Sequence, residues 1–385
     1  MEKDKENKIL NVPALRFPEF TEEWKEERLS KIAELSKGVG ISKEQLSEDG
    51  EPCILYGELY TKYKSEIIHK VISKTNIESS NLKRSKRNDV IIPCSGETAI
   101  DIAVARCVPF DNILLGGDLN IIRLHKDDGA FMAYQLNGKR KIDIAKLAQG
   151  VSVVHLYGEN IKAIKAYNPC LQEQQKIVKL LSMLDERIEV QNKIIEDLKK
   201  LRSAIYQELF SNLQGEEKSL SELAEITKGQ QVNGNQLSEN GKYYVMNGGI
   251  MPSGYYDDYN TEAGTISISE GGNSCGYVQY NKSKFWSGGH CYTLHIKPTA
   301  RISTLFLFHC LKWKEEDIMA LRIGSGLPNI QKKDLSKVRI IVPTFDKQQQ
   351  LIALLSTLQM KIEYEEMYTI NLDKQKLHLL SQMFI

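Results

Sequence analysis

The stretch LQEQQKIVKLLSMLDERIE, from Leu171 to Glu189, decides the fold, because the chain repeats it as FDKQQQLIALLSTLQMKIE from Phe345 to Glu363. The two copies lie 174 residues apart, and the same shift aligns Leu147–Phe210 with Leu321–Phe384 without a gap. A repeat of this size indicates that one structural unit occurs twice. We therefore expect two related halves.

A second alignment lies upstream. LSKIAELSKGVGISKEQLSEDG (Leu29–Gly50) is similar to LSELAEITKGQQVNGNQLSENG (Leu220–Gly241) at a shift of 191 residues, whereas residues 60–146 and 250–320 match poorly. Each unit thus has a shared entry, a variable middle and a shared exit. This pattern is expected of a protein that reads two different targets with one frame. Duplication followed by neutral drift in loops would leave the same pattern.

The shared exit predicts a long helix in each half. After Pro169 and Pro343, apolar residues recur at alternating steps of four and three, and no glycine or proline interrupts either run. This heptad spacing is typical of a helix with a narrow seam for one partner helix. The expected seam residues are Ile177, Leu181, Leu184, Ile188, Ile195, Leu198, Ile205, Leu209, Leu351, Leu355, Leu358, Ile362, Leu372, Leu379 and Met383.

The connectivity predicts how the two helices pair. The first helix delivers the chain to the second unit, and the second helix starts there and must run back, so the pair is antiparallel with pseudo-twofold symmetry. The polar seam positions suggest that Gln191 faces Lys376 and Arg202 faces Glu365. Pairing between two copies of the chain is the alternative, although an intramolecular partner has the higher effective concentration.

The remaining sequence predicts an α/β fold class, with two similar mixed α/β domains and mostly antiparallel sheets. Strands are expected at Val90–Pro93, Asn120–Leu124, Thr265–Ser269, Cys291–Ile296 and Val338–Val342, and short helices at Leu29–Leu35, Ser219–Ile226 and Ser303–Lys312. The expected division is a first domain at 1–168, a central helix at 169–214, a second domain at 215–342 and a C-terminal helix at 343–385.

The charge distribution allows nucleic-acid binding only through local patches, because the net charge is +1. In the first half, Tyr60 and Tyr63 alternate with a basic run that could contact phosphates, namely Lys62, Lys64, Lys70, Lys74, Lys83, Arg84, Lys86 and Arg87. In the second half, Asn233 and Asn273 are candidate base readers, because amides pair bidentately with adenine. A solvated surface would contain the same residue types, so only their clustering favours DNA.

Three common catalytic or metal-binding motifs are absent from the sequence. It contains no GxxxxGK[ST], HExxH or CxxC, and its histidines have no ligand-like spacing. The 7 cysteines are typical of reduced thiols in a cytoplasmic protein. We expect no catalysis, no cofactor, no metal site and no membrane span.

Together these features resemble the specificity (S) subunit of type I restriction–modification systems. The signature is carried by Gly150-Val151-Ser152, Asn168-Pro169 and Glu173-Gln174-Gln175 in the first half. Gly324-Ser325-Gly326, Pro343 and Gln348-Gln349 carry it in the second half. The opening NVPALRFPEFTEEWKEERLSKIAEL and the closing LLSQMFI are also similar to the family. One departure is Lys347, which stands where the first copy has Glu173.

The resemblance implies that each domain reads one half of a bipartite DNA target. The helices would fix the unread spacer and dock two modification (methyltransferase) subunits, which a restriction motor–nuclease subunit can join. Catalysis and cofactors would belong to those partners. Candidate DNA-binding residues are Lys37, Tyr60, Lys62, Tyr63, Lys64, Lys83, Arg84, Lys86, Arg87 and Ser95 in the first half, and Lys228, Asn233, Gly271, Asn273, Ser274, Ser325, Asn329 and Lys332 in the second.

Two other functional classes are weighed against this hypothesis. One is a coiled-coil scaffold whose domains bind proteins instead of DNA. The other is a fused methyltransferase, which the absent cofactor motifs disfavour.

Overall fold

The computed structural model describes residues 10–77, 81–324 and 326–385. It contains two compact units: unit 1 comprises the described residues up to Asn192 together with Met367–Ile385, and unit 2 comprises Lys193–Glu366. Two long helices, α7 (Leu171–Ser211) and α12 (Phe345–Gln382), contribute to both units. Among the described residues, no helix combines the length and the apolar character needed to cross a membrane.

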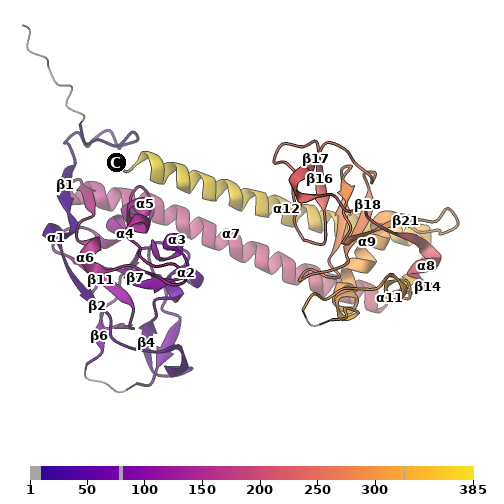
Figure 1. Cartoon of the computed structure of the whole chain (residues 1–385), viewed down its shortest axis with the longest axis horizontal. Coiled ribbons are helices and arrows are strands. Elements are labelled where there is room, and N and C mark those ends of the chain that lie inside the picture. The colour runs from indigo at the N-terminus through magenta and orange to yellow at the C-terminus, as the bar shows by residue number, and fades with distance from the viewer. Residues whose placement is uncertain (1–9, 78–80, 325) are drawn as a thin grey trace, which may run out of the picture. The chain divides into compact units, whose positions relative to one another are not determined.

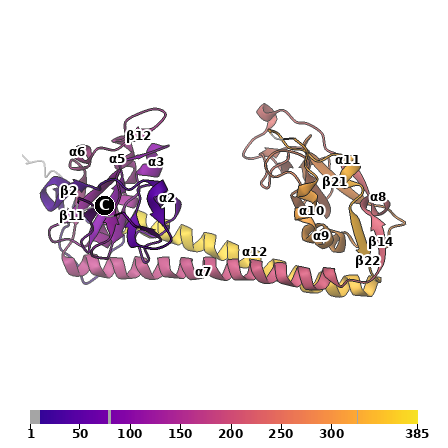
Figure 2. The same ribbon diagram turned by 90° about the horizontal axis from the view of Figure 1, so that it is seen from below.

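The long helices run antiparallel inside each unit, as the connectivity predicts. In unit 1, Ile177 and Leu181 near the start of α7 share a buried cluster with Leu380 and Met383 near the end of α12, and Figure 1 shows that end, marked C, beside the start of α7. In unit 2, the other end of α7 packs beside the start of α12, where Leu351 and Leu355 are buried. Figure 2 shows this pairing from a second side.

The predicted seam residues all lie on inward-facing positions. Ile177, Leu181, Ile195, Leu351, Leu355, Ile362, Leu372 and Met383 are buried, and Leu184, Ile188, Leu198, Ile205, Leu209, Leu358 and Leu379 are half-buried. Tyr206, Phe210, Leu380 and Phe384 are buried as well, although the heptad does not select them. They pack against the domains, so each long helix has a second buried face.

The expected pairing of polar seam residues is wrong. Lys376 Nζ lies 2.6 Å from Asp185 Oδ1, and Arg202 Nη1 donates to Gln359 Oε1 at 2.8 Å. In the described part of the chain Arg202 and Glu365 form no ion pair, and Glu365 pairs with Lys361. The two observed pairs still obey the symmetry, because the 174-residue shift relates Asp185 to Gln359 and Arg202 to Lys376. The observed register differs from the expected one by six residues in both units, and in unit 1 a second carboxylate, Glu66, also joins Lys376 from the first domain.

Each unit is built on a four-stranded antiparallel sheet. The strand order is β2-β11-β7-β9 in unit 1 and β15-β21-β18-β19 in unit 2. The strands of unit 1 are β2 (Ala33–Lys37), β7 (Asp89–Pro93), β9 (Arg106–Val108) and β11 (Leu119–Leu124). Those of unit 2 are β15 (Ala224–Lys228), β18 (Thr265–Ser269), β19 (Val278–Asn281) and β21 (Cys291–Ile296).

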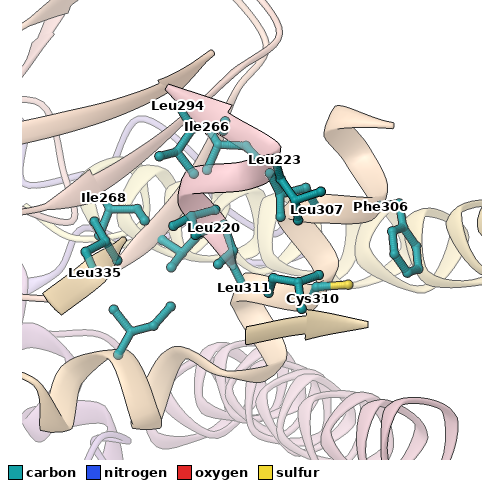
Figure 3. Packing of buried hydrophobic residues seen from close by; sticks show 14 of the residues in the cluster. Leu220, Leu223, Ile266, Ile268, Leu294, Phe306, Leu307, Cys310, Leu311 and Leu335 are labelled. Atoms are coloured by element: carbon teal, nitrogen blue, oxygen red, sulfur yellow. The ribbon is translucent and has the colours of Figure 1, made fainter. Parts of the chain in front are cut away.

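One helix covers each main sheet: α4 (Gly129–Asn137) in unit 1 and α9 (Thr304–Trp313) in unit 2. Figure 3 shows this packing in unit 2, where Phe306 and Leu311 of α9 belong to the same buried cluster as Ile266 and Leu294 of the sheet. Burial of such side chains stabilises the folded state by about 1.5–3 kcal/mol each.

A second sheet accompanies the first in both units. Its order is β3-β5-β4-β10-β6 in unit 1 and β17-β16-β20 in unit 2. Its strands are β3 (Leu46–Ser47), β4 (Glu51–Ile54), β5 (Ser73–Thr75), β6 (Lys83–Arg84), β10 (Leu114–Leu115), β16 (Tyr243–Met246), β17 (Tyr255–Tyr256) and β20 (Trp286–Ser287). Both sheets contain one parallel pair, β4 with β10 and β16 with β20. The middles that differ in sequence therefore share a frame.

Each unit also has an antiparallel pair of strands that brings its entry next to its exit. These pairs are β1 (Lys25–Arg28) with β13 (Lys165–Asn168) and β14 (Glu216–Ser219) with β22 (Arg339–Val342). All five predicted strands and the helix predicted at Ser303–Lys312 are present, with ends that differ by at most a residue.

Two predicted helices are too long. The helix predicted at Leu29–Leu35 ends as α1 (Leu29–Ile32), and the one predicted at Ser219–Ile226 ends as α8 (Leu220–Leu223). In both places the chain turns directly into a strand, where Leu35 pairs with Ile122 and Ile226 pairs with Leu294. The sheet partners that hold these residues are distant in sequence, so local periodicity does not reveal them.

A glutamine shared by the two repeated stretches, Gln174 and Gln348, joins each long helix to the domain before it. Gln174 Oε1 accepts a hydrogen bond from the Asp128 amide at 2.8 Å, and Gln348 Oε1 accepts one from the Ser303 amide at 2.9 Å. Asp128 and Ser303 are the N-cap residues of α4 and α9. Both glutamine side chains are buried, and each supplies a hydrogen-bond partner to the backbone amide of a half-buried N-cap residue.

The departure at Lys347 also has a structural reason. Glu173 is buried and accepts hydrogen bonds from the Arg16 guanidinium at 2.7 Å and from Trp24 Nε1 at 3.3 Å. Both donors lie in the segment that precedes β1. In unit 2 the chain enters β14 directly from α7, and Lys347 is exposed. A carboxylate is needed only where that extra segment packs.

Candidate DNA interface

Several loops meet at one end of the main sheet in each unit. The repeated Lys-Gly motif places Gly38 directly after β2, where a Cβ would lie 1.9 Å from the Gly116 carbonyl oxygen. A Cβ on Gly229, directly after β15, would lie 2.3 Å from the Gly288 carbonyl oxygen. Glycine is needed at both positions because two backbone segments touch there. The motif thus fixes the loop that follows Lys37 or Lys228.

Ser95 holds a second loop at this end of unit 1. The strand β8 (Ser95–Gly96) pairs with β12 (Val154–His155), and the buried Ser95 hydroxyl donates to Asp118 Oδ2 at 3.3 Å. Nearby are the predicted Lys37 and two exposed residues that the sequence did not single out, His155 and Tyr157. His155 and Tyr157 stack with ring centroids 6.3 Å apart, and Lys37 Nζ lies 6.0 Å from the Tyr157 ring.

The Tyr60–Lys64 segment divides between two roles. The half-buried Tyr60 hydroxyl lies 3.6 Å from where a Gly96 Cβ would stand, so it belongs beside the Ser95 loop. Tyr63 is buried, and its hydroxyl accepts a hydrogen bond from the Ile72 amide at 3.3 Å. Lys62 forms an ion pair with the buried Glu58 at 2.7 Å. Lys64 is exposed.

The basic cluster at 83–87 lies at the edge of the second sheet of unit 1, on and after β6. Arg84 forms a bidentate pair with Glu51 at 2.6 and 3.0 Å. Lys83 is half-buried, whereas Lys86 and Arg87 are exposed, and none of these three forms an ion pair within the described ranges. Three of the four cations in the cluster are therefore not neutralised by a carboxylate in the described part of the chain.

In unit 2, five of the predicted residues come together. Gly271 pairs with Asn329, and Lys228 Nζ lies 2.6 Å from the Glu270 carboxylate that precedes Gly271. Asn273 is exposed and Ser274 is half-buried in the same turn.

The remaining predicted residues of unit 2 have other surroundings. Asn233 is the exposed N-cap residue of a short 3₁₀ turn, Gly234–Gln236, and its counterpart in unit 1 is Ser42, which caps Lys43–Gln45. The capping role accounts for Asn233 without DNA. Lys332 is the exposed first residue of α11 (Lys332–Leu335). Ser325 lies outside the described residues.

The loop at Ser95 in unit 1 and the turn at Gly271 in unit 2 occupy equivalent positions. Ser95 pairs with His155 in unit 1 as Gly271 pairs with Asn329 in unit 2. His155 also bridges to Gln149, and Asn329 bridges to Ile323, which closes two loops of equal length. Gly150 and Gly324 enter these loops with φ values of 122° and 102°, which favour glycine. One backbone scaffold thus presents different side chains in the two units.

Comparison with known proteins agrees with this duplicated arrangement. The family model described as the type I restriction modification DNA specificity domain matches residues 21–200 and again residues 213–372. The chain belongs to this family of type I specificity proteins.

Relatives of the specificity family are recognisable at the sequence level. A protein of Mycoplasma pneumoniae named as a type I specificity subunit is 34% identical over 157 residues, which make up 40% of this chain and 42% of that protein. The chain thus matches less than half of the length of this relative. A Methanocaldococcus jannaschii protein named as a type I restriction enzyme specificity subunit is 22% identical over 95% of this chain and 94% of its own length.

The fold is also known in the family. The crystal structure of a type I system S subunit from M. genitalium superposes with a TM-score of 0.67 at 21% identity, and covers 97% of this chain and 99% of that one. At this identity the likeness shows the fold alone.

The long helices of this specificity protein expose apolar side chains in both units. In unit 1 these are Leu180, Met183, Val190, Met367, Ile370 and Leu377, and in unit 2 they are Ile194, Leu201, Leu354, Met360 and Tyr364. They recur along each helix on positions that face away from the seam. A run of exposed apolar residues rimmed by polar ones is typical of a protein-binding surface.

Proposed function

We propose that this chain is the non-catalytic DNA-specificity subunit of a type I restriction–modification complex, and that each unit reads one half of a bipartite target. The single observation that carries the proposal is the repeated loop scaffold. His155 and Asn329 stand at equivalent positions but offer different hydrogen-bonding groups, which is what two different half-sites require.

Within this proposal the backbone contacts and the base contacts come from different residues. The exposed Lys86 and Arg87 in unit 1 and Lys332 in unit 2 supply charge for phosphates. The loops around Ser95, Gly271 and Asn273 approach the base edges. The buried Tyr63 and Ser95 act by holding their loops, because their side chains are not accessible.

The proposed modules are residues 1–168 and 215–342 for the half-sites, and residues 169–214 and 343–385 for the spacer and the partners. A helix of 41 residues extends about 60 Å, longer than one duplex turn of about 34–36 Å, so its length can set the unread spacer. The exposed apolar residues of α7 and α12 would dock two modification subunits, which a restriction subunit joins. A cytoplasmic location follows from the same proposal.

Binding to DNA tests the proposal directly. Methylome sequencing of the host would report the bipartite adenine motif, and fluorescence anisotropy would then compare that duplex with a scrambled one as the salt concentration rises. We expect preference for the motif and a steep loss of affinity with salt. Equally weak, salt-insensitive binding to both duplexes would contradict DNA recognition and favour a scaffold that binds proteins.

Single substitutions separate the two half-sites. His155→Ala should weaken discrimination in one half of the motif, and Asn329→Ala in the other, each by about 1–3 kcal/mol per base pair read. Exchange of residues 215–342 for another domain should change one half only. A change in both halves after either substitution would contradict the assignment of one unit to each half.

A further inference from the structure

The outer edge of the main sheet is covered in unit 1. The segment Glu66–Ile68 runs parallel to the edge strand β9, where the Cys107 amide donates to the Glu66 carbonyl at 2.7 Å and the Ile68 amide donates to the Cys107 carbonyl at 3.0 Å. The Glu66 carboxylate then reaches Lys376 Nζ at 2.5 Å. This short extended segment thus supplies hydrogen bonds to the edge strand β9 and a carboxylate to Lys376.

The equivalent edge strand in unit 2 is β19, and Tyr280 is the counterpart of Cys107. Cys107 pairs with Val90 of the neighbouring strand β7, and Tyr280 pairs with Ile266 at the equivalent place in β18. In an antiparallel pair, alternate residues direct both backbone groups away from the neighbouring strand. No hydrogen bond to the amide or carbonyl of Tyr280 is found among the described residues.

The residue two positions earlier confirms the equivalence of the two edges. In unit 1 both backbone groups of Ala105 are bound by the Asn137 side chain of α4, at 2.7 and 2.9 Å. In unit 2 the Val278 amide is bound by Glu315 at 2.8 Å, and its carbonyl is bound by Lys312 of α9 at 3.1 Å. In unit 2, it is the backbone amide and carbonyl of the next outward-facing residue, Tyr280, that have no such partner among the described residues.

A groove of about 790 Å³ lies along this open edge, entirely within unit 2. Val278 and Tyr280 line it from the sheet, Phe308 from α9, and Arg202 and Gln359 from the long helices. Its three lysines are matched by carboxylates in the pairs Lys199–Glu366, Lys282–Glu363 and Lys312–Glu315.

Arg202 is the cation in this groove that has no matching carboxylate. Its recorded partner is the neutral side-chain amide of Gln359, and none of the ion pairs in the described part of the chain includes it. Arg202 occupies the position that Lys376 has in unit 1, where the carboxylate of Glu66 arrives. The groove therefore lacks both features that Glu66–Ile68 supplies in unit 1: an added strand and a negative charge.

We propose that the groove binds an extended, glutamate-containing segment of a partner protein, which adds as a parallel strand at Tyr280 and places the glutamate carboxylate on Arg202. Strand addition supplies the backbone hydrogen bonds, and the carboxylate supplies the selectivity. Duplex DNA fits this groove less well, because Glu315, Glu363 and Glu366 would face its many phosphates. The groove does not depend on DNA recognition by the loops.

The chain provides its own probe for this site. The peptide KSEIIHK, with the sequence of Lys64–Lys70, carries the segment that fills the position in unit 1. Titration of the full chain with this peptide, to about 1 mM so that weak binding is detected, should slow hydrogen exchange at the Tyr280 amide. Two altered peptides serve as matched controls and leave the protein unchanged.

A peptide with Glu66→Gln should bind about tenfold more weakly, because the hydrogen bond to Arg202 is no longer charge-assisted. A peptide with Ile68→Pro should not protect Tyr280, because it lacks the amide that meets the strand carbonyl. On the protein side, Arg202→Gln should abolish the preference for Glu over Gln, whereas Lys282→Gln should preserve it.

Three results would overturn the proposal. They are an unprotected Tyr280 amide at the highest peptide concentration, equal binding of the Glu and Gln peptides, and protection that appears with duplex DNA but not with peptide. Protection that rises with protein concentration in the absence of peptide would instead identify a second copy of this chain as the occupant.

Discussion

The junction between domain and long helices is built from charges in unit 1 and from largely neutral groups in unit 2. In unit 1, Tyr134 of α4 donates to Asp185 at 2.6 Å, and Lys376 bridges Asp185 and Glu66. In unit 2, the counterpart of Tyr134 is His309 of α9, which lies 2.8 Å from the Tyr206 hydroxyl and 3.3 Å from the Ser356 hydroxyl. The same frame therefore tolerates two different chemistries at the same place.

The difference sets opposite electrostatic demands. Burial alone would lower the pKa of Lys376, but the carboxylates of Glu66 and Asp185 outweigh it and raise that pKa. Burial, with a smaller effect from Arg202, lowers the pKa of His309 to about 4. In unit 1 the carboxylates favour the charged form of Lys376, whereas in unit 2 burial favours the neutral form of His309. Specific substitutions should expose this contrast, and hydrogen exchange of α4 and α9 can follow each unit separately.

The largest effect is expected from Lys376→Met. It leaves the buried carboxylates of Asp185 and Glu66 without their cation, which should destabilise unit 1 by about 3–5 kcal/mol. The matched substitution Arg202→Met removes one hydrogen bond to a neutral amide and should cost about 1 kcal/mol in unit 2. Similar losses of exchange protection in α4 and α9 would contradict the contrast.

Acid should destabilise unit 2 through His309. Its folded pKa of about 4 lies below the ordinary value of 6.5, so the unfolded state binds the proton first. The stability supplied by neutral His309 is present above pH 6.5 and is lost as the pH falls toward 4, on the order of 3 kcal/mol in total. His309→Tyr, which installs the unit 1 residue, should remove this loss from exchange protection in α9. An unchanged pH profile in that variant would show that another group titrates.

The repeated glutamines should behave alike in both units. Gln174→Ala and Gln348→Ala each remove the partner of one half-buried N-cap amide, and each should cost about 1–3 kcal/mol. Denaturant dependence of exchange in α4 and α9 would measure both values. A cost confined to one unit would mean that the other glutamine is dispensable and that the frame is less symmetric than the contacts indicate.

The smallest change in stability is expected at Lys347, where the second repeated stretch differs from the first. Lys347→Glu restores the carboxylate of the first copy at an exposed position without a donor pair, so the stability of unit 2 should change by about 0.5 kcal/mol or less. Glu173→Lys buries a cation beside Arg16 and should strongly destabilise unit 1. Thermal unfolding would compare the melting temperatures of the two variants. Equal decreases would contradict the conclusion that the carboxylate is needed only where the Arg16–Trp24 segment packs.

The sequence predicts the features that depend on local periodicity and chain connectivity. The heptad gives the seam residues, and the order of the repeats gives the antiparallel pairing within each unit. It does not give the register of the polar contacts, because Asp185 and Gln359 reach Lys376 and Arg202 from positions outside the heptad pattern. It also misses the sheets that the two variable middles share. Short strands such as β4 and β16 pair in the same way although their residues differ, for example Cys53 in β4 and Val245 at the equivalent position in β16.

The candidate site was only partly predictable for the same reason. The Lys-Gly motif and Gly271 stand out by repeat or composition, and the structure brings them to one end of each sheet. His155 and Tyr157 carry no local signal, because they become neighbours of Lys37 only through pairing with the Ser95 strand. The sequence marks the loops that contain Val151 and Leu327, but it does not show that these two apolar side chains are exposed.

Glu66 also limits which first domains the long helices can accept. A first domain acquired from another gene must bring a carboxylate to that position, or Lys376 remains with Asp185 alone. The corresponding contact in unit 2, Arg202 with Gln359, lies wholly between the long helices. Exchange of the second domain should therefore disturb this contact less than exchange of the first domain disturbs the contact of Lys376.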